Sequence, residues 1–240
     1  MIDLNKLNPE QKQAVLTTEG PLLILAGAGS GKTRVLTYRA AYLLEKGVPP
    51  WAILAITFTN KAAREMRERI NRLAGEAADD MWVMTFHALS ARILRRDIEK
   101  LGYKREFSIY DDDDQMTLIK RILKKLDISD KSYPPRAVKS VISDAKNHML
   151  SPEEWLKDNP DFRSKPYYRA YCEYEKELKE NNALDFDDLI LKTLELLTEH
   201  PPVLEVYRRK FSYIMVDEYQ DTNMAQYMLV RTLAGDKKNV

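Results

Sequence analysis

AGAGSGKT, residues 26–33, joins an apolar run to a helical pattern and decides how the rest of the chain is interpreted. The apolar run, Leu22 to Ala26, predicts a buried strand, and the residues from Thr33 onward predict a helix. Glycines at 27, 29 and 31 let consecutive backbone N–H groups turn toward an anion at the positive end of that helix. The stretch therefore predicts a phosphate-binding loop, although Ala26 stands where the usual G-x-x-x-x-G-K-S/T pattern has its first glycine. A glycine-rich turn without a ligand is the alternative.

A second segment, YIMVDEYQDTN at residues 213–223, supplies the acidic groups that such a loop requires. Lys32 would reach the terminal phosphates of a nucleotide, and the Thr33 hydroxyl would ligate Mg²⁺. An apolar strand ends at Asp217, which we expect to hold Mg²⁺ through its water shell, and Glu218 follows as the group that polarises the attacking water. Such a pair can also be a strand end that meets solvent, but the phosphate loop favours the catalytic interpretation.

Four short apolar runs lack the alternation of a sheet with one wet face and predict buried parallel strands at residues 22–26, 53–57, 82–85 and 213–216. Helical patterns connect the first three, and from about residue 88 to 199 nearly every segment is helical and charged. We therefore predict an α/β fold whose parallel sheet is flanked by helices and interrupted by a mainly α-helical subdomain. Residues 1–101 and 184–240 are expected in the sheet domain, and residues 102–183 in the insertion.

The amino-acid composition says more about the cellular compartment of the protein than about its binding partner. Lys and Arg number 38 against 37 Asp and Glu, so the net charge of +1 neither favours nor excludes a polyanionic partner. The single cysteine, Cys172, excludes an intramolecular disulfide and a multi-cysteine zinc site. The chain opens without a signal-peptide pattern, and its longest apolar runs are far too short to span a bilayer. We expect a cytoplasmic protein with no membrane partner.

Several segments resemble, in the same order, the N-terminal part of the superfamily 1 DNA helicases of the UvrD/Rep/PcrA type. They are AGAGSGKT, ITFTNKAAREM (56–66), TFHAL (85–89), ALDFDDL (183–189) and VDEYQDTN (216–223), and the opening LNPEQKQAV (7–15) resembles the adenine-reading Q motif. The resemblance covers the whole chain. It implies a RecA-like P-loop NTPase motor domain with a helical insertion, the use of ATP and Mg²⁺, and 3′ to 5′ translocation on single-stranded DNA in repair or replication.

The resemblance also assigns roles to individual residues of the nucleotide site. Gln11 would read the adenine edge, and Arg34 would stack on the base. Gln220 would link the nucleotide state to the rest of the site, and it completes the expected catalytic set with Lys32 and Glu218. The phosphates and Mg²⁺ would be held by Ala28, Gly29, Ser30, Gly31, Lys32 and Thr33, together with Asp217.

The segment TFTN after the second predicted strand is expected to face DNA. Thr57, Thr59 and Asn60 offer hydroxyl, amide and helix N-terminal N–H donors to a DNA phosphate, which tracks the backbone without reading sequence. Phe58 is the less usual member, because a strand phenylalanine more commonly belongs to the core. The family resemblance places this position against DNA, where a phenyl ring can stack on a base.

The segment TFHAL repeats this arrangement one strand further on. Thr85 and His87 are the expected DNA contacts, whereas Phe86 is expected to be packed. Among the basic residues of RILRRDIEK, Arg95 and Arg96 are candidates for contact with single-stranded or duplex DNA, although acidic neighbours also favour a solvated helix face.

The acidic segment ALDFDDL invites a metal-site interpretation, but local structure explains it better. Asp185 has the position of a helix N-cap, and Asp187 and Asp188 fall in the first turn, where the helix dipole favours negative charge. The run DDDD at residues 111–114 is explained in the same way, as a cap and a solvated turn.

The resemblance places further parts of the machinery outside these 240 residues. A second motor domain would complete the ATP site with arginine fingers, which raise turnover by about 10³–10⁵ in related phosphoryl transfers. We therefore expect the chain alone to show little or no ATP turnover and no unwinding. Expected partners are single-stranded DNA, a DNA duplex junction, that second domain, and repair or replication proteins. Two other functions stay open: a non-catalytic nucleotide-dependent scaffold that binds DNA or protein, and a P-loop kinase of small molecules.

Overall fold

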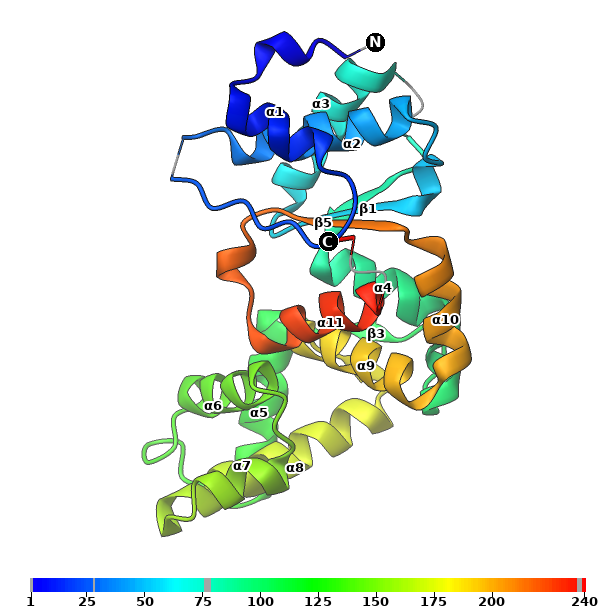
Figure 1. Ribbon diagram of the computed structural model, residues 1–240. Coiled ribbons are helices and arrows are strands. Elements are labelled where there is room, and N and C mark those ends of the chain that lie inside the picture. Colours follow the sequence, from blue (N-terminus) through cyan, green and yellow to red (C-terminus); the bar gives the residue numbers. More distant parts are fainter. Residues whose placement is uncertain (1, 28, 76–78, 237–238) are drawn as a thin grey trace. The chain divides into compact units, whose positions relative to one another are not determined.

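The structure is a computed structural model that describes residues 2–27, 29–75, 79–236 and 239–240 (Figure 1). The chain forms two compact units. The sheet unit contains Met1–Leu89, Pro201–Thr222 and Val230–Val240, and the helical unit contains Ser90–His200 and Asn223–Leu229. The helical unit thus includes the whole 102–183 segment that the sequence indicated as an insertion, and it extends beyond that segment on both sides. Within the described residues, no helix is long and apolar enough to cross a membrane.

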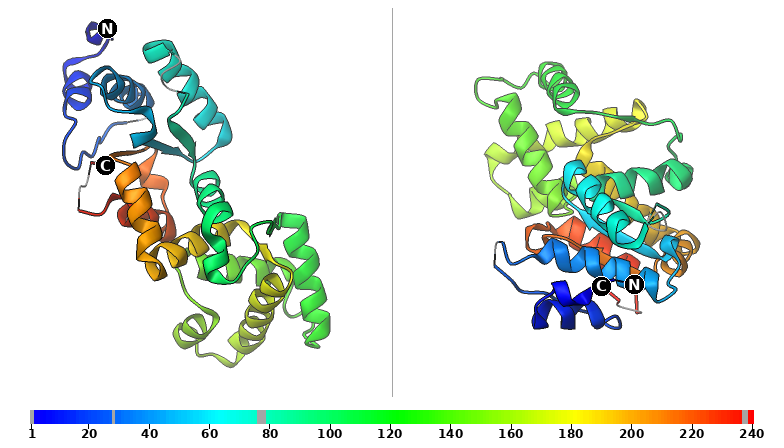
Figure 2. Two further views of the ribbon diagram at one scale, coloured as in Figure 1. Left: turned by 90° about the vertical axis from the view of Figure 1, so that its right-hand side faces the viewer. Right: turned by 90° about the horizontal axis from the view of Figure 1, so that it is seen from above.

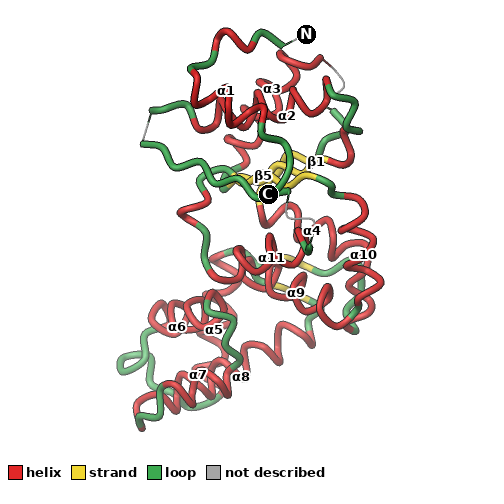
Figure 3. Tube along the Cα trace, in the orientation of Figure 1, coloured by secondary structure: helices red, strands yellow, loops and turns green. Residues whose placement is uncertain are grey.

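The sheet unit is built on three parallel strands, drawn in yellow in Figure 3. Strand β1 (Ile53–Thr57) lies between β2 (Trp82–Thr85) and β5 (Tyr213–Val216). Ala55 of β1 pairs with Val83 on one side and with Met215 on the other. Every residue of β1 is buried, as a run of consecutive apolar residues requires. The predicted fold class, a parallel sheet flanked by helices, is confirmed.

Helices pack against this sheet through apolar side chains at helical spacing. The helices of the unit are α1 (Pro9–Leu16), α2 (Lys32–Glu45), α3 (Asn60–Ala74) and α10 (Pro201–Lys210), with short 3₁₀ turns at Leu4–Lys6, Pro50–Ala52 and Tyr219–Asp221. The sheet core joins Ala40 and Leu43 of α2 and Met66 and Ile70 of α3 to Ile53, Ala55, Val83 and Met215 of the strands. These contacts hold α2 and α3 against the sheet, so the residues at their N-terminal ends have defined positions.

The strand predicted at residues 22–26 is wrong. The segment is extended but belongs to neither sheet, and its Leu23 and Leu25 side chains are 64% and 86% exposed. The reason lies at the other end of the chain: the Leu22 N–H donates to the Val240 carbonyl at 2.9 Å, and the Ile214 N–H donates to the Asn239 carbonyl at 2.9 Å. Residues 239–240 therefore bond both to this segment and to β5, and the two do not pair directly.

The helical unit consists of a helix bundle with one short pair of strands (Figure 2). Strands β3 (Ser108–Ile109) and β4 (Ala183–Leu184) pair in parallel. The helices are α5 (Asp112–Lys125), α6 (Pro135–Asn147), α7 (Pro152–Asp158), α8 (Lys165–Glu180) and α9 (Phe186–Glu199), with 3₁₀ turns at Ile98–Leu101 and Phe162–Ser164. Two more helices, α4 (Phe86–Asp97) and α11 (Met224–Ala234), cross from one unit into the other along the chain. The core of this unit includes Leu118, Ile122, Val138, Ile142, Tyr171, Tyr174 and Leu178.

Two acidic segments begin helices, as the sequence predicts. Asp185 is the N-cap of α9 and accepts from the Asp188 N–H at 2.8 Å, while the Asp188 carboxylate accepts from the Asp185 N–H at 3.1 Å. Asp111 and Asp114 form the same reciprocal capping box at the start of α5. Such caps satisfy backbone donors that a helix leaves unpaired.

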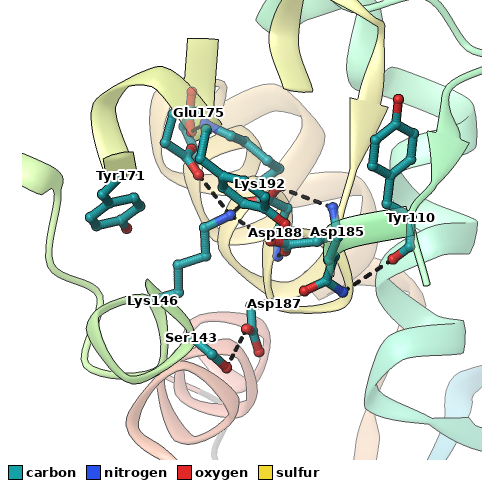
Figure 4. A network of polar contacts seen from close by, with 12 residues as sticks. Tyr110, Ser143, Lys146, Tyr171, Glu175, Asp185, Asp187, Asp188 and Lys192 are labelled. Atoms are coloured by element: carbon teal, nitrogen blue, oxygen red, sulfur yellow. Dashed lines mark hydrogen bonds and ion pairs between the residues drawn. The ribbon is translucent and has the colours of Figure 1, made fainter. Parts of the chain in front are cut away.

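A buried lysine connects three helices of the helical unit, shown in Figure 4. Lys146 of α6 is only 1% exposed, and its Nζ lies 2.8 Å from Asp185, 2.7 Å from Asp188 and 2.7 Å from Glu175 of α8. Tyr174 donates to Asp185 at 3.0 Å. We call these five residues the lysine cage.

Charge in the lysine cage depends on mutual compensation. Burial raises the pKa of Asp188 well above its ordinary value, and the Asp185 carboxylate raises it further. Burial acts on Asp185 in the same direction, but Lys146 and the hydrogen bonds outweigh it and leave the pKa of Asp185 lowered. Burial alone would lower the pKa of Lys146, yet its surrounding carboxylates raise it well above the ordinary value. Lys146 therefore stays positively charged, and its charge compensates the buried carboxylates.

Replacing Lys146 with Met should destabilise the helical unit by about 3–5 kcal/mol, because the carboxylates would remain buried without their cation. The loss should be larger at about pH 8 than at about pH 5. Without the lysine, the folded-state pKa of these carboxyls lies above the unfolded value, so stability that depends on their bound protons is lost as pH rises. Urea denaturation followed by circular dichroism measures the effect.

Lys176→Met is the matched control for this substitution. Lys176 is an exposed lysine of α8 that lies 3.9 Å from Glu180, and its loss should change stability by less than about 1 kcal/mol. Equal stability of the two variants would contradict the role of the lysine cage.

Candidate functional site

The glycine loop leads into the first turn of α2. Gly31 is the N-cap of this helix with φ of +90°, and Gly29 has φ of +75°, which are left-handed conformations that favour glycine. A Cβ at Gly31 would also lie 3.0 Å from the Gln11 Nε2 atom, so this position is restricted both by backbone conformation and by space. Ala28, expected among the phosphate-binding residues, lies outside the described residues.

The structure brings the glycine loop and the acidic strand end together across 184 positions of sequence. The Thr33 hydroxyl donates to the Asp217 carboxylate at 3.2 Å, and Lys32 Nζ lies 3.7 Å from the Glu218 carboxylate. Lys32 also donates to the Ala26 carbonyl at 3.3 Å. The register of the sheet explains the placement, because the Asp217 N–H continues the β5 ladder by donating to the Ile56 carbonyl of β1 at 2.9 Å.

Asp217 and Glu218 differ in environment. Asp217 is 5% exposed, and burial is the main cause that raises its pKa; Glu218 contributes in the same direction, while the Thr33 hydrogen bond opposes the shift. Glu218 has a 41% exposed side chain and a left-handed backbone with φ of 51°. Left-handed backbone at a residue other than glycine costs about 1–3 kcal/mol and is concentrated at functional sites. Gln220 donates its amide N–H to the Glu218 carboxylate.

Gln11 and Arg34, the expected adenine contacts, lie beside the loop and already have protein partners. Gln11 donates to the Ser30 carbonyl at 2.9 Å and accepts from the Asn8 N–H at 3.2 Å, as part of the capping box of α1. Arg34 donates to the Lys6 carbonyl at 2.8 Å. Its guanidinium carbon also lies 5.6 Å from the centre of the Tyr38 ring.

Arg39 supports this arrangement and was missed by the sequence analysis. It is 5% exposed and donates to three carbonyls at the C-terminal end of α1 and just beyond, those of Ala14 at 2.8 Å, Thr17, and Thr18 at 3.1 Å. The chain thus ties the helix that carries Gln11 to the helix that carries Lys32. The sequence does contain a pattern that could have identified Arg39. This residue stands four positions after buried Val35 and four before buried Leu43, on the buried face of α2.

An apolar pocket of about 520 Å³ adjoins the phosphate loop within the sheet unit. Residues 21–25 line one side, and Leu36 and Arg39 of α2 and residues 215–216 line the rest, with Val240 also at its wall. Its polar end is formed by Lys32, Asp217, Glu218 and Gln220. Concave apolar walls with a few convergent polar groups are typical of ligand sites.

The residues expected to face DNA lie at the carboxyl ends of neighbouring strands, since Thr57 pairs with Thr85 in register. Both threonine side chains are nevertheless buried, at 2% and 6% exposure. The Thr85 hydroxyl accepts from the Ala88 N–H at 3.2 Å, and the Thr59 hydroxyl caps α3 by accepting from the Ala62 N–H at 3.1 Å. These hydroxyls therefore fix the starts of helices.

The aromatic and remaining polar residues of this edge differ in exposure. Phe86 is buried, as expected, and the half-buried Phe58 packs edge-on against it with ring centres 5.6 Å apart. Asn60 is exposed, and His87 is half-buried. In the helical unit Arg95 lies over the Phe107 ring at 3.9 Å and donates to the Arg105 carbonyl at 2.6 Å, so its guanidinium has structural partners.

A glycine loop that begins a helix and meets an acidic pair at the end of a parallel strand defines a RecA-like α/β domain of the P-loop class. The chain belongs to the family of the UvrD/REP helicase N-terminal domain, whose profile matches residues 7–240. The family resemblance inferred from the motifs is thereby confirmed.

Individual relatives agree with this assignment. The chain is 55% identical over 238 residues to the ATP-dependent DNA helicase PcrA of Bacillus subtilis (strain 168), which covers 99% of this chain and 32% of the relative. It is 53% identical over 238 residues to the proteins of that name from Staphylococcus aureus (strain Mu50) and Staphylococcus epidermidis, again over 99% of this chain and 33% of each relative. The chain therefore spans about a third of the length of these relatives.

Replacing Arg39 with Met should lower the free energy of unfolding by about 1.5–3 kcal/mol, because carbonyls at the end of α1 lose a charged donor. Amide exchange at Thr17, whose N–H donates to Gln13 at 3.0 Å, should become faster. Arg72→Met on α3 is the control, since Arg72 is 74% exposed and pairs only loosely with Glu68 at 3.9 Å. Unchanged exchange at Thr17 in the Arg39 variant would contradict the assignment.

Proposed function

We propose that this chain is the nucleotide-binding part of the motor of an ATP-dependent DNA helicase. The observation that carries the proposal is the contact of Thr33 with Asp217 beside the contact of Lys32 with Glu218, at the end of a parallel strand. The relatives named ATP-dependent DNA helicase extend well beyond the matched region, so the activity of the whole protein is part of the proposal. We further propose 3′ to 5′ movement on single-stranded DNA, in DNA repair or replication in the cytoplasm.

The donors at the acidic strand end suit Mg²⁺. A hydroxyl and a carboxylate are the hard oxygen ligands that this ion prefers, and Thr33 and Asp217 present them 3.2 Å apart. Bound Mg²⁺ would neutralise charge on the phosphate oxygens. In our proposal the loop from Gly29 to Lys32 holds the phosphates through its N–H groups and the lysine ammonium.

The contact of Lys32 with Glu218 suggests how binding prepares hydrolysis. The structure places Lys32 Nζ 3.7 Å from the Glu218 carboxylate. Lys32 would turn from this carboxylate to the phosphates, and Glu218 would then accept a proton from the attacking water. Gln220, which donates to the same carboxylate, would hold it in place during this exchange.

Gln11 would read the adenine edge, and Arg34 would stack on the base. The Gln11 bond to the Ser30 carbonyl joins the base-reading position directly to the phosphate loop. The Gln11 amide uses one N–H and one oxygen lone pair for its bonds to Ser30 and Asn8, so its second N–H and second lone pair can bond the adenine edge while the bond to the loop is kept.

Single-stranded DNA is the proposed partner at the carboxyl ends of β1 and β2. Thr59 and Thr85 use their hydroxyls as helix caps and Thr57 is buried, so the contribution of this edge would come from the helix starts that Thr59 and Thr85 fix and from backbone N–H groups. Asn60 and His87 would supply side-chain donors, and Phe58 would stack on a base. A duplex junction, a second motor domain with arginine fingers, and repair or replication proteins complete the proposed partners.

Lys32→Ala should weaken binding of a fluorescent ATP analogue with Mg²⁺ by about 10- to 100-fold, because a charged contact to phosphate is lost. Lys46→Ala is the control, since Lys46 caps the other end of α2 and lies 5.3 Å from the Tyr42 ring. The same samples should release little or no phosphate, because arginine fingers would come from another domain. Unchanged affinity in the Lys32 variant would contradict the nucleotide site. Phosphate release at motor rates would contradict the proposal that hydrolysis requires arginine fingers from another domain.

Phe58→Ala should weaken binding of a labelled oligothymidine by about 5- to 150-fold, because loss of one base stack costs about 1–3 kcal/mol. The control is Trp51→Ala at the opposite end of the same strand: Trp51 is 55% exposed and precedes β1, whereas Phe58 follows it. Fluorescence anisotropy measures both. Equal affinities of the two variants for the oligonucleotide would remove the stacking assignment.

A further inference from the structure

The lead-in segment, residues 19–26, runs from just beyond α1 to the start of the glycine loop. Its last residue contacts the candidate nucleotide site, because the Ala26 carbonyl accepts from Lys32 at 3.3 Å. Its first residues form a turn, in which Gly20 has φ of +81° and donates its N–H to the Asn239 side-chain oxygen at 2.8 Å. The position of the glycine loop therefore depends in part on how the far end of this segment is held.

The Glu19 carboxylate joins the lead-in segment to β5. Its Oε1 atom accepts from the Tyr213 hydroxyl at 2.7 Å, and its Oε2 atom accepts from the Asn239 Nδ2 group at 3.2 Å. The Asn239 amide has one consistent orientation, because its oxygen faces the Gly20 N–H and its nitrogen faces a carboxylate. The Asn239 carbonyl also accepts from the Ile214 N–H at 2.9 Å. Both oxygens of Glu19 thus have partners that belong to β5 or bond to it.

The charge of Glu19 also acts on the buried Arg39 guanidinium. Burial lowers the pKa of Arg39, and Tyr213 and Glu19 oppose this shift. Burial raises the pKa of Tyr213, and the hydrogen bond to Glu19 and the charge of Glu19 act in the same direction. Arg39 itself donates to the carbonyls of Thr17 and Thr18, directly before Glu19. A guanidinium and a carboxylate therefore hold this stretch of chain from two sides within the sheet unit.

We propose that Glu19 is a positioning residue for the phosphate loop, because it fixes the lead-in segment against the strand that ends at Asp217. The inference rests on the proposed function, since the offset between loop and acid matters only if both hold a nucleotide with Mg²⁺. Glu19 bonds to the first residue of β5, and Asp217 directly follows the last. A displacement of about 1 Å in such a site can cost a large factor, so this contact restricts where Lys32 can lie relative to Asp217.

Amide hydrogen exchange measured by NMR without nucleotide tests the effect of Glu19 on the loop. Glu19→Ala should accelerate exchange about twofold to tenfold at Gly20 and Leu22 of the lead-in segment, because about one net hydrogen bond is lost. The acceleration should extend to Ser30, whose N–H bonds within the glycine loop at 3.3 Å. Exchange at Ala63 in α3 should stay at the wild-type rate, because Glu19 is exposed and its loss leaves the sheet unit folded.

Nucleotide affinity and a conservative variant separate positioning from general stability. In Glu19→Ala, affinity for the fluorescent ATP analogue with Mg²⁺ should fall by about threefold to tenfold. Glu19→Gln should restore part of both effects, because its amide keeps a hydrogen-bond acceptor but loses the charge that acts on Arg39. Tyr213→Phe should accelerate exchange at Ser30 less in a chain that carries Glu19→Ala than in the unaltered chain, because the partner is gone.

Glu45→Ala is the matched control. Glu45 is the last residue of α2, about 20 Å along this helix from the loop, and it accepts from the Ile2 N–H at 2.8 Å. Its substitution should leave exchange at Ser30 and nucleotide affinity unchanged.

The proposal is overturned if Glu19→Ala leaves exchange at Ser30 or a measurable ATP affinity unchanged, or if Glu45→Ala has equal effects. It is also overturned if Tyr213→Phe acts as strongly in the Glu19→Ala chain as in the unaltered chain. A chain that binds no ATP would contradict the proposed nucleotide site, whereas exchange at Ser30 would still decide whether Glu19 positions the loop.

Discussion

The hydrogen bond between the Thr33 hydroxyl and the Asp217 carboxylate is the contact on which the candidate nucleotide site depends. It requires a helix that begins directly after a glycine loop and a strand that ends directly at an acid. The left-handed backbone of Gly31 lets the helix begin directly after the loop. The parallel register of β1 and β5 places Asp217 at the end of its strand. Lys32 and Glu218 come together as a consequence, because each is the immediate neighbour of one partner.

The helical unit is held together by buried charge as well as by an apolar core. Its core is apolar, but the junction of α6, α8 and α9 is held by buried charge, in which Lys146 compensates three carboxylates. Buried ion clusters are costly to desolvate and sensitive to loss of one member, so they fix geometry more than they add stability. The same junction holds the start of α11, since Asn223 bonds to Asn147, the neighbour of Lys146.

Sequence reasoning succeeded where the cause is local or topological. The cap at Asp185 follows from neighbouring residues, and the position of Asp217 directly after a parallel strand follows from the apolar run that precedes it. Sequence reasoning failed where residues far away in the sequence determine the local structure. The run at 22–26 has strand composition, but residues 239–240 occupy its backbone donor. Arg39 and Asn147 look like ordinary helix residues until the carbonyls and the amide that they contact are known.

The most direct test is calorimetric titration of the chain with ATP, once with Mg²⁺ and once with a chelator. If Thr33 and Asp217 form a metal site beside the phosphate loop, removal of Mg²⁺ should weaken ATP binding by at least about tenfold, or about 1.4 kcal/mol. Asp217→Asn should abolish most of that dependence on Mg²⁺ while Lys32 still holds the phosphates. Equal affinity with and without Mg²⁺ in the unaltered chain would contradict the account.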